Sequence, residues 1–295
     1  MTRPLLSALA ATVAVSICGL SAQQRFLSSV GVVTMNVAVR LNGAPARGLT
    51  ASDFELTDNF IARKVDVSLA ASRPADITLL IDTSGSMDGS MEEMRDHVRD
   101  VARLLGRDDR LRLLTFGDDV REVFGFRAGD STPPLDALTA GGWTALYDAL
   151  GLALIHQPAP ERSHLIVVFS DGIDSSSTID LNTLKELTRR SDAVLQTFID
   201  VPRPTTLSRR ALPSRETPPR PPVGVIADLT GGNVTFMGRD DDVPGSFRAA
   251  LAEFRQRYVL TYAIPEPVQS GWHNVTVTVK RPGNFEVRTR KGYVQ

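Results

Sequence analysis

Two short, largely apolar runs in the middle of the chain constrain its fold most strongly. They span residues 77–81 (ITLLI) and 165–169 (LIVVF). Runs of this kind are typical of strands that are buried on both faces of a parallel sheet. The segment after the first run, residues 91–105, has apolar side chains at helical spacing. The pattern therefore predicts strands that alternate with helices.

The same alternation continues to residue 257. Further strands are predicted at residues 110–116, 122–126, 194–201 and 233–237, with 122–126 at a sheet edge. Further helices are predicted at residues 145–155, 181–190, 223–229 and 246–257. Alternation of strand and helix is typical of α/β folds. We therefore expect a doubly wound, mostly parallel sheet.

The two ends of the chain carry a different pattern, in which apolar and polar residues alternate. Near the N-terminus the alternating segments are residues 33–41, 54–57 and 64–69, with a turn at Asp58–Asn59. Near the C-terminus they are residues 258–263, 275–279 and 285–289. Two or three strands are marginal alone. We therefore expect residues 26–72 and 258–295 to form one antiparallel β module around an α/β domain at 75–257.

The first 22 residues resemble an export signal. Arg3 precedes an apolar stretch at residues 5–20, and a small residue, Ala22, follows it. This order predicts a secretory signal peptide that is cleaved near Ala22. The mature protein would then be secreted or periplasmic, without a membrane span. A retained N-terminal anchor and a lipoprotein modified at Cys18 are the alternatives.

Composition excludes several classes of protein. Lys and Arg number 33 against 34 for Asp and Glu, which argues against a nucleic-acid binder. The only cysteine is Cys18, which excludes a disulfide framework. Residues 201–223 are rich in proline and arginine, which predicts an exposed loop inserted in the α/β domain. A basic docking segment for an acidic partner is the alternative for this loop.

Polar residues follow both apolar runs. Asp82, Ser84 and Ser86 come directly after the first run, and Asp171 follows the second. Thr144 lies between them, at the predicted start of a helix. Ligands of open α/β sheets bind at the carboxyl ends of the strands. We therefore expect these five side chains to meet at one edge of the sheet.

The donor set predicts a metal site. It contains two carboxylates and three hydroxyls, with no imidazole and no thiolate. Oxygen donors favour Mg²⁺, with Mn²⁺ or Ca²⁺ as alternatives. Neutral hydroxyls leave the cation short of donated charge, so it favours an anionic ligand from outside. The simplest such ligand is an Asp or Glu carboxylate of a protein partner.

The order Asp82-x-Ser84-x-Ser86, then Thr144, then Asp171 resembles the metal-ion-dependent adhesion site of von Willebrand factor type A domains. The resemblance implies a Rossmann-like fold and a role in protein binding. It also implies that the two serines and the threonine contact Mg²⁺ directly. The two aspartates would hold the ion through water or orient the serines.

The resemblance spans residues 75–257, and the flanking strands are similar to those of secreted bacterial proteins that carry this domain. One departure is Trp143, which precedes Thr144 where a small residue is expected. Its ring would shape or partly cover the site.

No enzyme motif accompanies this pattern, and we expect a protein without enzymatic activity. The sequence lacks a phosphate-binding loop and a nucleophile elbow. A Mg²⁺-dependent phosphatase with an aspartyl-phosphate intermediate is one alternative, but Ser84 stands where its second carboxylate is needed. A structural or assembly component with an unused metal site is the other.

Other polar clusters are expected to have structural roles. Asp118–Asp119 is predicted to form a hairpin turn, and Asp174 with residues 175–177 a solvated loop. Asp240 to Asp242 is predicted to lead into a helix. The histidines, which are scattered along the chain, are expected on the surface or in packing roles: His97, His156, His164 and His273.

Overall fold

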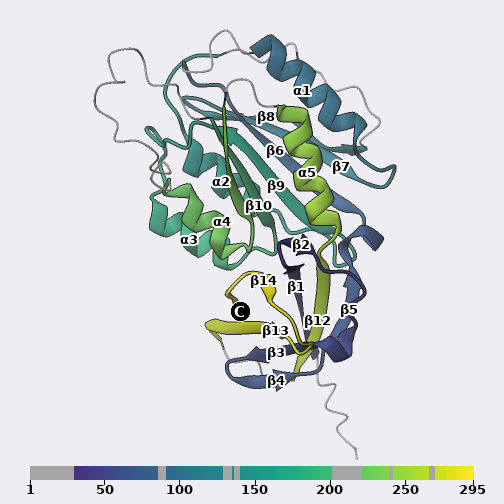
Figure 1. Cartoon of the computed structure of the whole chain (residues 1–295). Coiled ribbons are helices and arrows are strands. Elements are labelled where there is room, and N and C mark those ends of the chain that lie inside the picture. Colours follow the sequence, from purple (N-terminus) through teal and green to yellow (C-terminus); the bar gives the residue numbers. More distant parts are fainter. Residues whose placement is uncertain are drawn as a thin grey trace, which may run out of the picture.

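The computed structural model describes residues 30–85, 91–128, 135, 140–200, 221–238, 242–265 and 270–295. An α/β domain lies on a smaller β-sandwich (Figure 1). The predicted signal peptide, Ser86, most of the 201–223 loop and Asp240–Asp241 lie outside the described residues. None of the helices in these ranges has the length and apolarity needed to cross a membrane.

The apolar runs form the inner strands of a six-stranded sheet with the order β11-β10-β9-β6-β7-β8. Its strands are β6 (Ala75–Asp82), β7 (Arg110–Phe116), β8 (Val120–Ala128), β9 (Ser163–Ser170), β10 (Val194–Asp200) and β11 (Asn233–Met237). Every residue of β6 and β9 is buried. All neighbours are parallel except β7 and β8, which are antiparallel. The predicted α/β fold class is confirmed.

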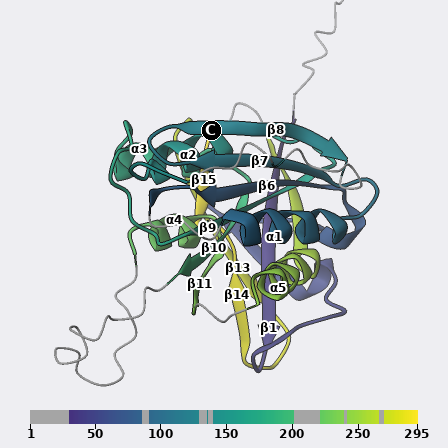
Figure 2. The same cartoon turned by 90° about the horizontal axis from the view of Figure 1, so that it is seen from above.

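Helices cover both faces of this sheet. They are α1 (Met91–Arg103), α2 (Leu146–Leu154), α3 (Leu181–Arg189), α4 (Val223–Leu229) and α5 (Val243–Arg255). Successive side chains of a strand point to opposite faces. Leu79 and Ile81 therefore pack in the core with α1 and α5, whereas Leu80 packs in the core with α2, α3 and α4. Figure 2 shows α1 and α5 side by side on their face.

The two ends of the chain pair in the β-sandwich, as predicted. One sheet contains β1 (Val30–Leu41), β2 (Ala44–Pro45), β5 (Asp66–Leu69), β12 (Tyr258–Pro265) and β14 (Phe285–Arg288). The other contains β3 (Phe54–Asp58), β4 (Ile61–Arg63), β13 (Trp272–Val279) and β15 (Gly292–Val294). Met35 of β1 lies opposite Leu260 of β12, and Leu56 of β3 lies opposite Val277 of β13.

A buried carboxylate links strands of the sandwich from both ends of the chain. Asp58 of β3 is fully buried. It accepts hydrogen bonds from the hydroxyls of Tyr262 at 3.1 Å and Tyr293 at 3.0 Å, and His273 Nδ1 lies 2.9 Å from it. The four residues come from β3, β12, β13 and β15. The network therefore fixes the C-terminal strands on an N-terminal one.

Two local predictions were wrong, and one short strand was missed. The turn between β3 and β4 is Asn59–Phe60, where both residues have positive φ (47° and 66°), rather than Asp58–Asn59. The predicted strand at 64–69 is found as β5, which pairs with β12, whereas β4, which pairs with β3, was not predicted. Helix α5 begins at Val243 instead of 246, since the Asp242 side chain caps it by accepting the Gly245 N–H at 2.8 Å.

Arginine side chains connect the sandwich to the α/β domain. Arg290, in the sandwich, donates to the Asp192 carboxylate at 2.5 Å and to the Ser191 carbonyl at 3.2 Å. Arg288 of β14 donates to Asn233 of β11 at 3.1 Å and to Glu253 of α5 at 3.3 Å. Because a guanidinium group binds several acceptors in fixed directions, these contacts hold the two parts in one orientation.

Candidate metal centre

Asp82, the last residue of β6, is fully buried and is bound by neutral groups. Its Oδ1 accepts the Ser84 N–H at 2.9 Å, and its Oδ2 accepts the Ser170 hydroxyl at 2.7 Å. Ser170 in turn accepts the Gly172 N–H at 3.0 Å. In the described part of the chain, no Lys, Arg or His pairs with Asp82. The carboxylate is therefore oriented but not neutralised.

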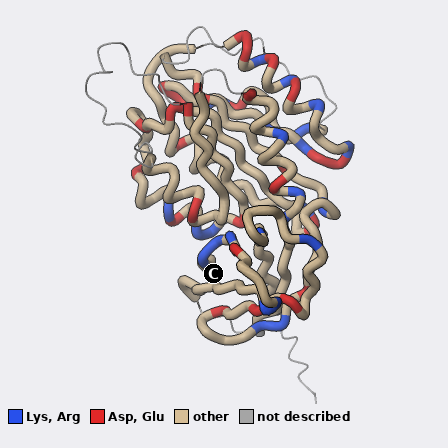
Figure 3. Tube along the Cα trace, viewed as in Figure 1, with Lys and Arg blue, Asp and Glu red and all other residues tan. Residues whose placement is uncertain are grey.

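Asp171 lies close enough to Asp82 to affect its ionisation. Burial raises the pKa of Asp82, hydrogen bonds from Ser84 and Ser170 oppose the rise, and the Asp171 carboxylate adds to it. Asp171 is half-buried, and its Oδ1 accepts the N–H of Ile173 at 2.9 Å. Two carboxylates thus share this edge of the sheet, where Figure 3 shows several acidic positions near the top of the view.

The loop that carries Thr144 is hydrogen-bonded to the loop that carries Ser84. Gly85 donates to the Gly142 carbonyl at 3.1 Å, and Gly141 donates to the Thr83 carbonyl at 2.8 Å. Ser84 and Thr144 are both buried. The backbone therefore brings the two hydroxyl-bearing loops together at the end of β6.

Asp118, in the turn between β7 and β8, holds the same loop. Its Oδ1 accepts the Trp143 N–H at 2.6 Å. Only glycine fits at position 142, since φ is +80° and a Cβ atom would lie 2.1 Å from Asp118 Oδ2. The predicted hairpin turn at Asp118–Asp119 is confirmed, and its first carboxylate positions the residue next to Thr144.

The segment 174–177 caps helix α2, where a solvated loop was predicted. The N-cap of α2 is Ala145, which has no side-chain acceptor. Three side chains supply the missing acceptors: Ser175 for the N–H of Thr144 at 2.9 Å, Asp174 for that of Tyr147 at 3.0 Å, and Ser177 for that of Asp148 at 3.1 Å. Free N–H groups at a helix start need such acceptors, and a distant loop provides them here.

Four of the five predicted ligands therefore lie at the end of β6 and on loops that meet at the same edge, and the fifth, Ser86, lies outside the described residues. Trp143, which was predicted to shape or partly cover the site, is 69% exposed. No role in orienting the site was predicted for Ser170, Asp118 or Asp174. Only Ser170 had a local signal, because it directly precedes Asp171.

The residues present fit a hard divalent cation. The described candidates offer carboxylate and hydroxyl oxygens, and no cluster of three or more His, Cys, Asp or Glu side chains is found in the described ranges. Oxygen donors of these two kinds suit Mg²⁺, Mn²⁺ or Ca²⁺. The Thr144 hydroxyl accepts no hydrogen bond from another described side chain, which leaves its oxygen available to a cation.

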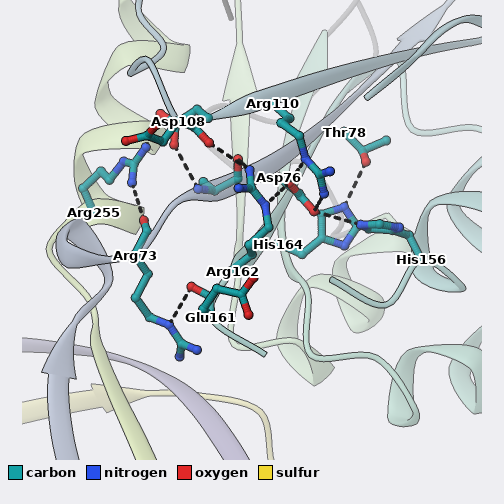
Figure 4. Close-up of polar contacts among 12 residues, drawn as sticks. Arg73, Asp76, Thr78, Asp108, Arg110, His156, Glu161, Arg162, His164 and Arg255 are labelled. Carbon is teal, nitrogen blue, oxygen red and sulfur yellow. Dashed lines mark hydrogen bonds and ion pairs between the residues drawn. The ribbon is translucent and has the colours of Figure 1, made fainter. Parts of the chain in front are cut away.

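The opposite end of β6 carries a contrasting cluster (Figure 4). Asp76 is fully buried, and it accepts hydrogen bonds from Arg110 at 2.7 Å and Arg162 at 2.6 Å, with His156 Nε2 at 3.1 Å. Burial alone raises the pKa of Asp76, but the hydrogen bonds from Arg110, His156 and Arg162 outweigh it and lower the pKa to about 2.

His164 packs beside this cluster. Its Nε2 is 2.9 Å from the Thr78 hydroxyl, and burial together with the neighbouring His156 lowers the pKa of His164 to about 3. The expected packing role of these two histidines is confirmed, because both lie among side chains of the sheet and its loops.

Comparison with known proteins matches residues 76–198 to the family described as von Willebrand factor type A domain. No curated protein matches the sequence. Among solved structures, von Willebrand factor type A from Catenulispora acidiphila is 15% identical, with 92% of this chain and 75% of that chain covered and a TM-score of 0.50. At this identity the similarity shows the fold alone.

Two further solved structures are similar. Conserved hypothetical protein BatB from Bacteroides thetaiotaomicron is 12% identical, with 61% of this chain and 98% of that chain covered and a TM-score of 0.45. Proximal thread matrix protein 1 from the mussel byssus, described with a zinc-occupied MIDAS motif, is 16% identical, with 68% and 49% covered and a TM-score of 0.47.

Proposed function

We propose that the chain is a non-enzymatic binding protein that holds a protein partner through a divalent cation, because residues 76–198 match the family described as von Willebrand factor type A domain. One observation carries the proposal. Asp82 is a fully buried carboxylate that receives only neutral donors from the described residues, next to a second carboxylate, Asp171. Buried charges are normally paired or bound to metals.

Five residues would hold the ion. The hydroxyls of Ser84, Ser86 and Thr144 would contact it, and the carboxylates of Asp82 and Asp171 would act through water or by orienting the serines. Mg²⁺ is the proposed ion, with Mn²⁺ or Ca²⁺ as alternatives. The bound ion would supply an electrophilic point for a carboxylate from the partner.

The chain's own residues prepare the site for that ligand. Asp82 fixes the Ser84 backbone, while Asp118 and Ser175 fix the N–H groups of Trp143 and Thr144. Their hydrogen bonds hold the ligand loops in place before binding, which lowers the entropy cost of association.

The composition of the site supports a role without catalysis. A phosphatase that forms an aspartyl-phosphate at Asp82 needs an acid or base beside it, and Ser84 occupies that position. Phosphatase activity that depends on Asp82 would favour the enzyme instead.

Metal binding is tested by calorimetric titration of the purified protein with Mg²⁺, Ca²⁺, Mn²⁺ and Zn²⁺. We expect one divalent ion per chain, with binding abolished in Asp82→Asn. Asp119→Asn is the matched control, because it removes an exposed carboxylate from the same edge and should bind metal normally. No metal binding by the wild type, or equal binding by Asp82→Asn, would refute the site.

The partner is tested by affinity capture with Mg²⁺ and with a chelator, on wild type and Asp82→Ala. We expect proteins that are retained only by the wild type in Mg²⁺. Retention that survives both the chelator and the substitution contradicts the metal bridge. Normal function of an Asp82→Ala strain would favour the structural or assembly role.

We infer from residues 1–22 that the protein acts outside the cytoplasm after cleavage near Ala22. N-terminal sequencing of the protein from its native host should begin at Gln23. A chain that retains residues 5–20 would favour the anchor, and one that begins at a lipidated Cys18 would favour the lipoprotein.

A further inference from the structure

Two exposed apolar side chains flank the proposed metal centre. Trp143 directly precedes Thr144 and is 69% exposed, and Ile173 follows Asp171 by two positions and is 62% exposed. A tryptophan and an isoleucine in water at a site that otherwise consists of carboxylates and hydroxyls need an explanation. We call this pair the apolar rim.

The backbone of the rim is fixed although its side chains are solvated. The Trp143 N–H donates to Asp118 Oδ1 at 2.6 Å, and the Ile173 N–H donates to Asp171 Oδ1 at 2.9 Å. Each apolar residue is thus held by a carboxylate of the site. Exposed aromatic side chains are among the groups that contribute most to protein interfaces, and a backbone that is already fixed loses little order when they bind.

The negative charge of Asp82 and Asp171 determines which kind of partner can bind over the apolar rim. Without a cation, Asp82 and Asp171 repel an acidic partner; with one, an external carboxylate becomes the natural ligand. A partner that places its carboxylate on the metal brings its neighbouring side chains over Trp143 and Ile173. Apolar neighbours gain by burying that surface, and polar neighbours do not.

We propose that the site selects a carboxylate that is flanked by apolar side chains, which cover Trp143 and Ile173. This inference rests on the proposed function, since it assumes a metal-bound carboxylate. It adds the specificity that the metal alone lacks: the ion binds any acidic residue, and the rim accepts only those in an apolar setting.

The test uses three synthetic peptides in Mg²⁺, followed by calorimetry. The first has one Glu between Leu and Phe in a glycine chain, the second has the same Glu between glycines, and the third has Gln between Leu and Phe. We expect the first to bind at least about tenfold more tightly than either of the others. In Trp143→Ser and Ile173→Ser this advantage should fall, while Mg²⁺ binding persists.

Ile155→Ser is the matched control. Ile155 lies at the other end of α2 and is 58% exposed. The substitution therefore removes an exposed apolar side chain at a distance from the site. In a Trp272→Phe background Trp143 is the only tryptophan, and its emission should shift to shorter wavelength as the first peptide covers it.

The outcomes separate this inference from the proposed function. Equal binding of the two Glu peptides, or of the Glu and Gln peptides between Leu and Phe, overturns the inference while Mg²⁺ binding stands. Failure of every peptide in a protein that binds Mg²⁺ overturns it as well. Absence of Mg²⁺ binding overturns the proposed function itself.

Discussion

Strand β6 carries a fully buried aspartate at each end, and the two have opposite surroundings. Asp76, at the start of the strand, is bound by two arginines and a histidine. Asp82, at its end, is bound by a backbone N–H and a serine hydroxyl. The pKa of Asp76 is lowered to about 2, whereas that of Asp82 is raised.

Burial alone therefore does not identify a functional carboxylate. Asp76 has its counter-charge within the chain, so it completes a structural cluster. Asp82 lacks one among the described residues and lies beside a second carboxylate, so a cation from solution would complete it. Perturbed ionisation arises in both structural and functional clusters, and the source of the compensating charge distinguishes them.

The largest expected effect on stability comes from replacing aspartate by asparagine at each end of β6 in turn. Asp76→Asn leaves Arg110 and Arg162 without their anion and should lower the free energy of unfolding by about 3 kcal/mol. Asp82→Asn keeps a polar side chain of equal size. In the absence of metal it should change the free energy of unfolding by less than about 1 kcal/mol. Urea denaturation in chelator measures both. Equal losses would show that Asp82 is structural too.

Acid should destabilise the Asp76 end over a defined range of pH. His164 is held neutral with a pKa of about 3 against an ordinary 6.5, so below pH 6.5 the unfolded chain takes up a proton that the folded chain excludes. Stability then falls by up to about 1.4 kcal/mol per pH unit as the pH approaches 3. Asp76 adds a loss only between its ordinary value of 3.8 and about 2.

The variant His164→Gln tests this assignment, because it keeps a partner for Thr78 and removes the titration. Denaturation between about pH 7 and pH 4.5 should give a shallower loss in the variant than in the wild type. The groups that face His164 are His156, Asp76 and Arg112. An unchanged slope would show that His164 is not the source of the acid sensitivity.

The smallest effect concerns how the Asp82 end is kept in place. Asp174→Ala removes the acceptor for Tyr147 at the start of α2 and should cost about 1 kcal/mol. Asp180→Ala removes the cap of α3, where Asp180 accepts the Thr183 N–H at 2.8 Å, at a similar cost. Only Asp174→Ala should also weaken Mg²⁺ binding, by a few-fold. Equal metal affinities would mean that the cap does not position Thr144.

Much of the fold could be predicted from the sequence, because its signals are local. The buried strands have apolar centres, as in residues 165–169 of β9, and the helices have clear apolar faces, as in α1. The strand β15 gave no such signal: its three residues form a strand because they pair with Trp272 to Asn274. The division between β4 and β5 also depends on distant partners.

The candidate site shows the same limit. Asp82, Ser84, Thr144 and Asp171 could be predicted because a motif fixes their order. Asp118 could not be linked to Trp143, since the chain between them gives no sign that the β7–β8 turn reaches that loop. The Asp76 cluster was missed for the same reason, because its members are separated along the sequence and meet only when the sheet forms.

The sandwich made from both ends of the chain has a consequence for the order of folding during synthesis. Most pairings of the α/β domain join segments that are synthesised soon after one another. In the sandwich, β1 can pair with β12 only after residue 258 has been synthesised, and Asp58 can bind Tyr293 only near the end of synthesis. Non-local pairings form late. The α/β domain is therefore expected to fold first, with the apolar face of the N-terminal strands uncovered until the final strands emerge. Truncation of the last few residues should leave that face open to aggregation, while the α/β domain remains folded.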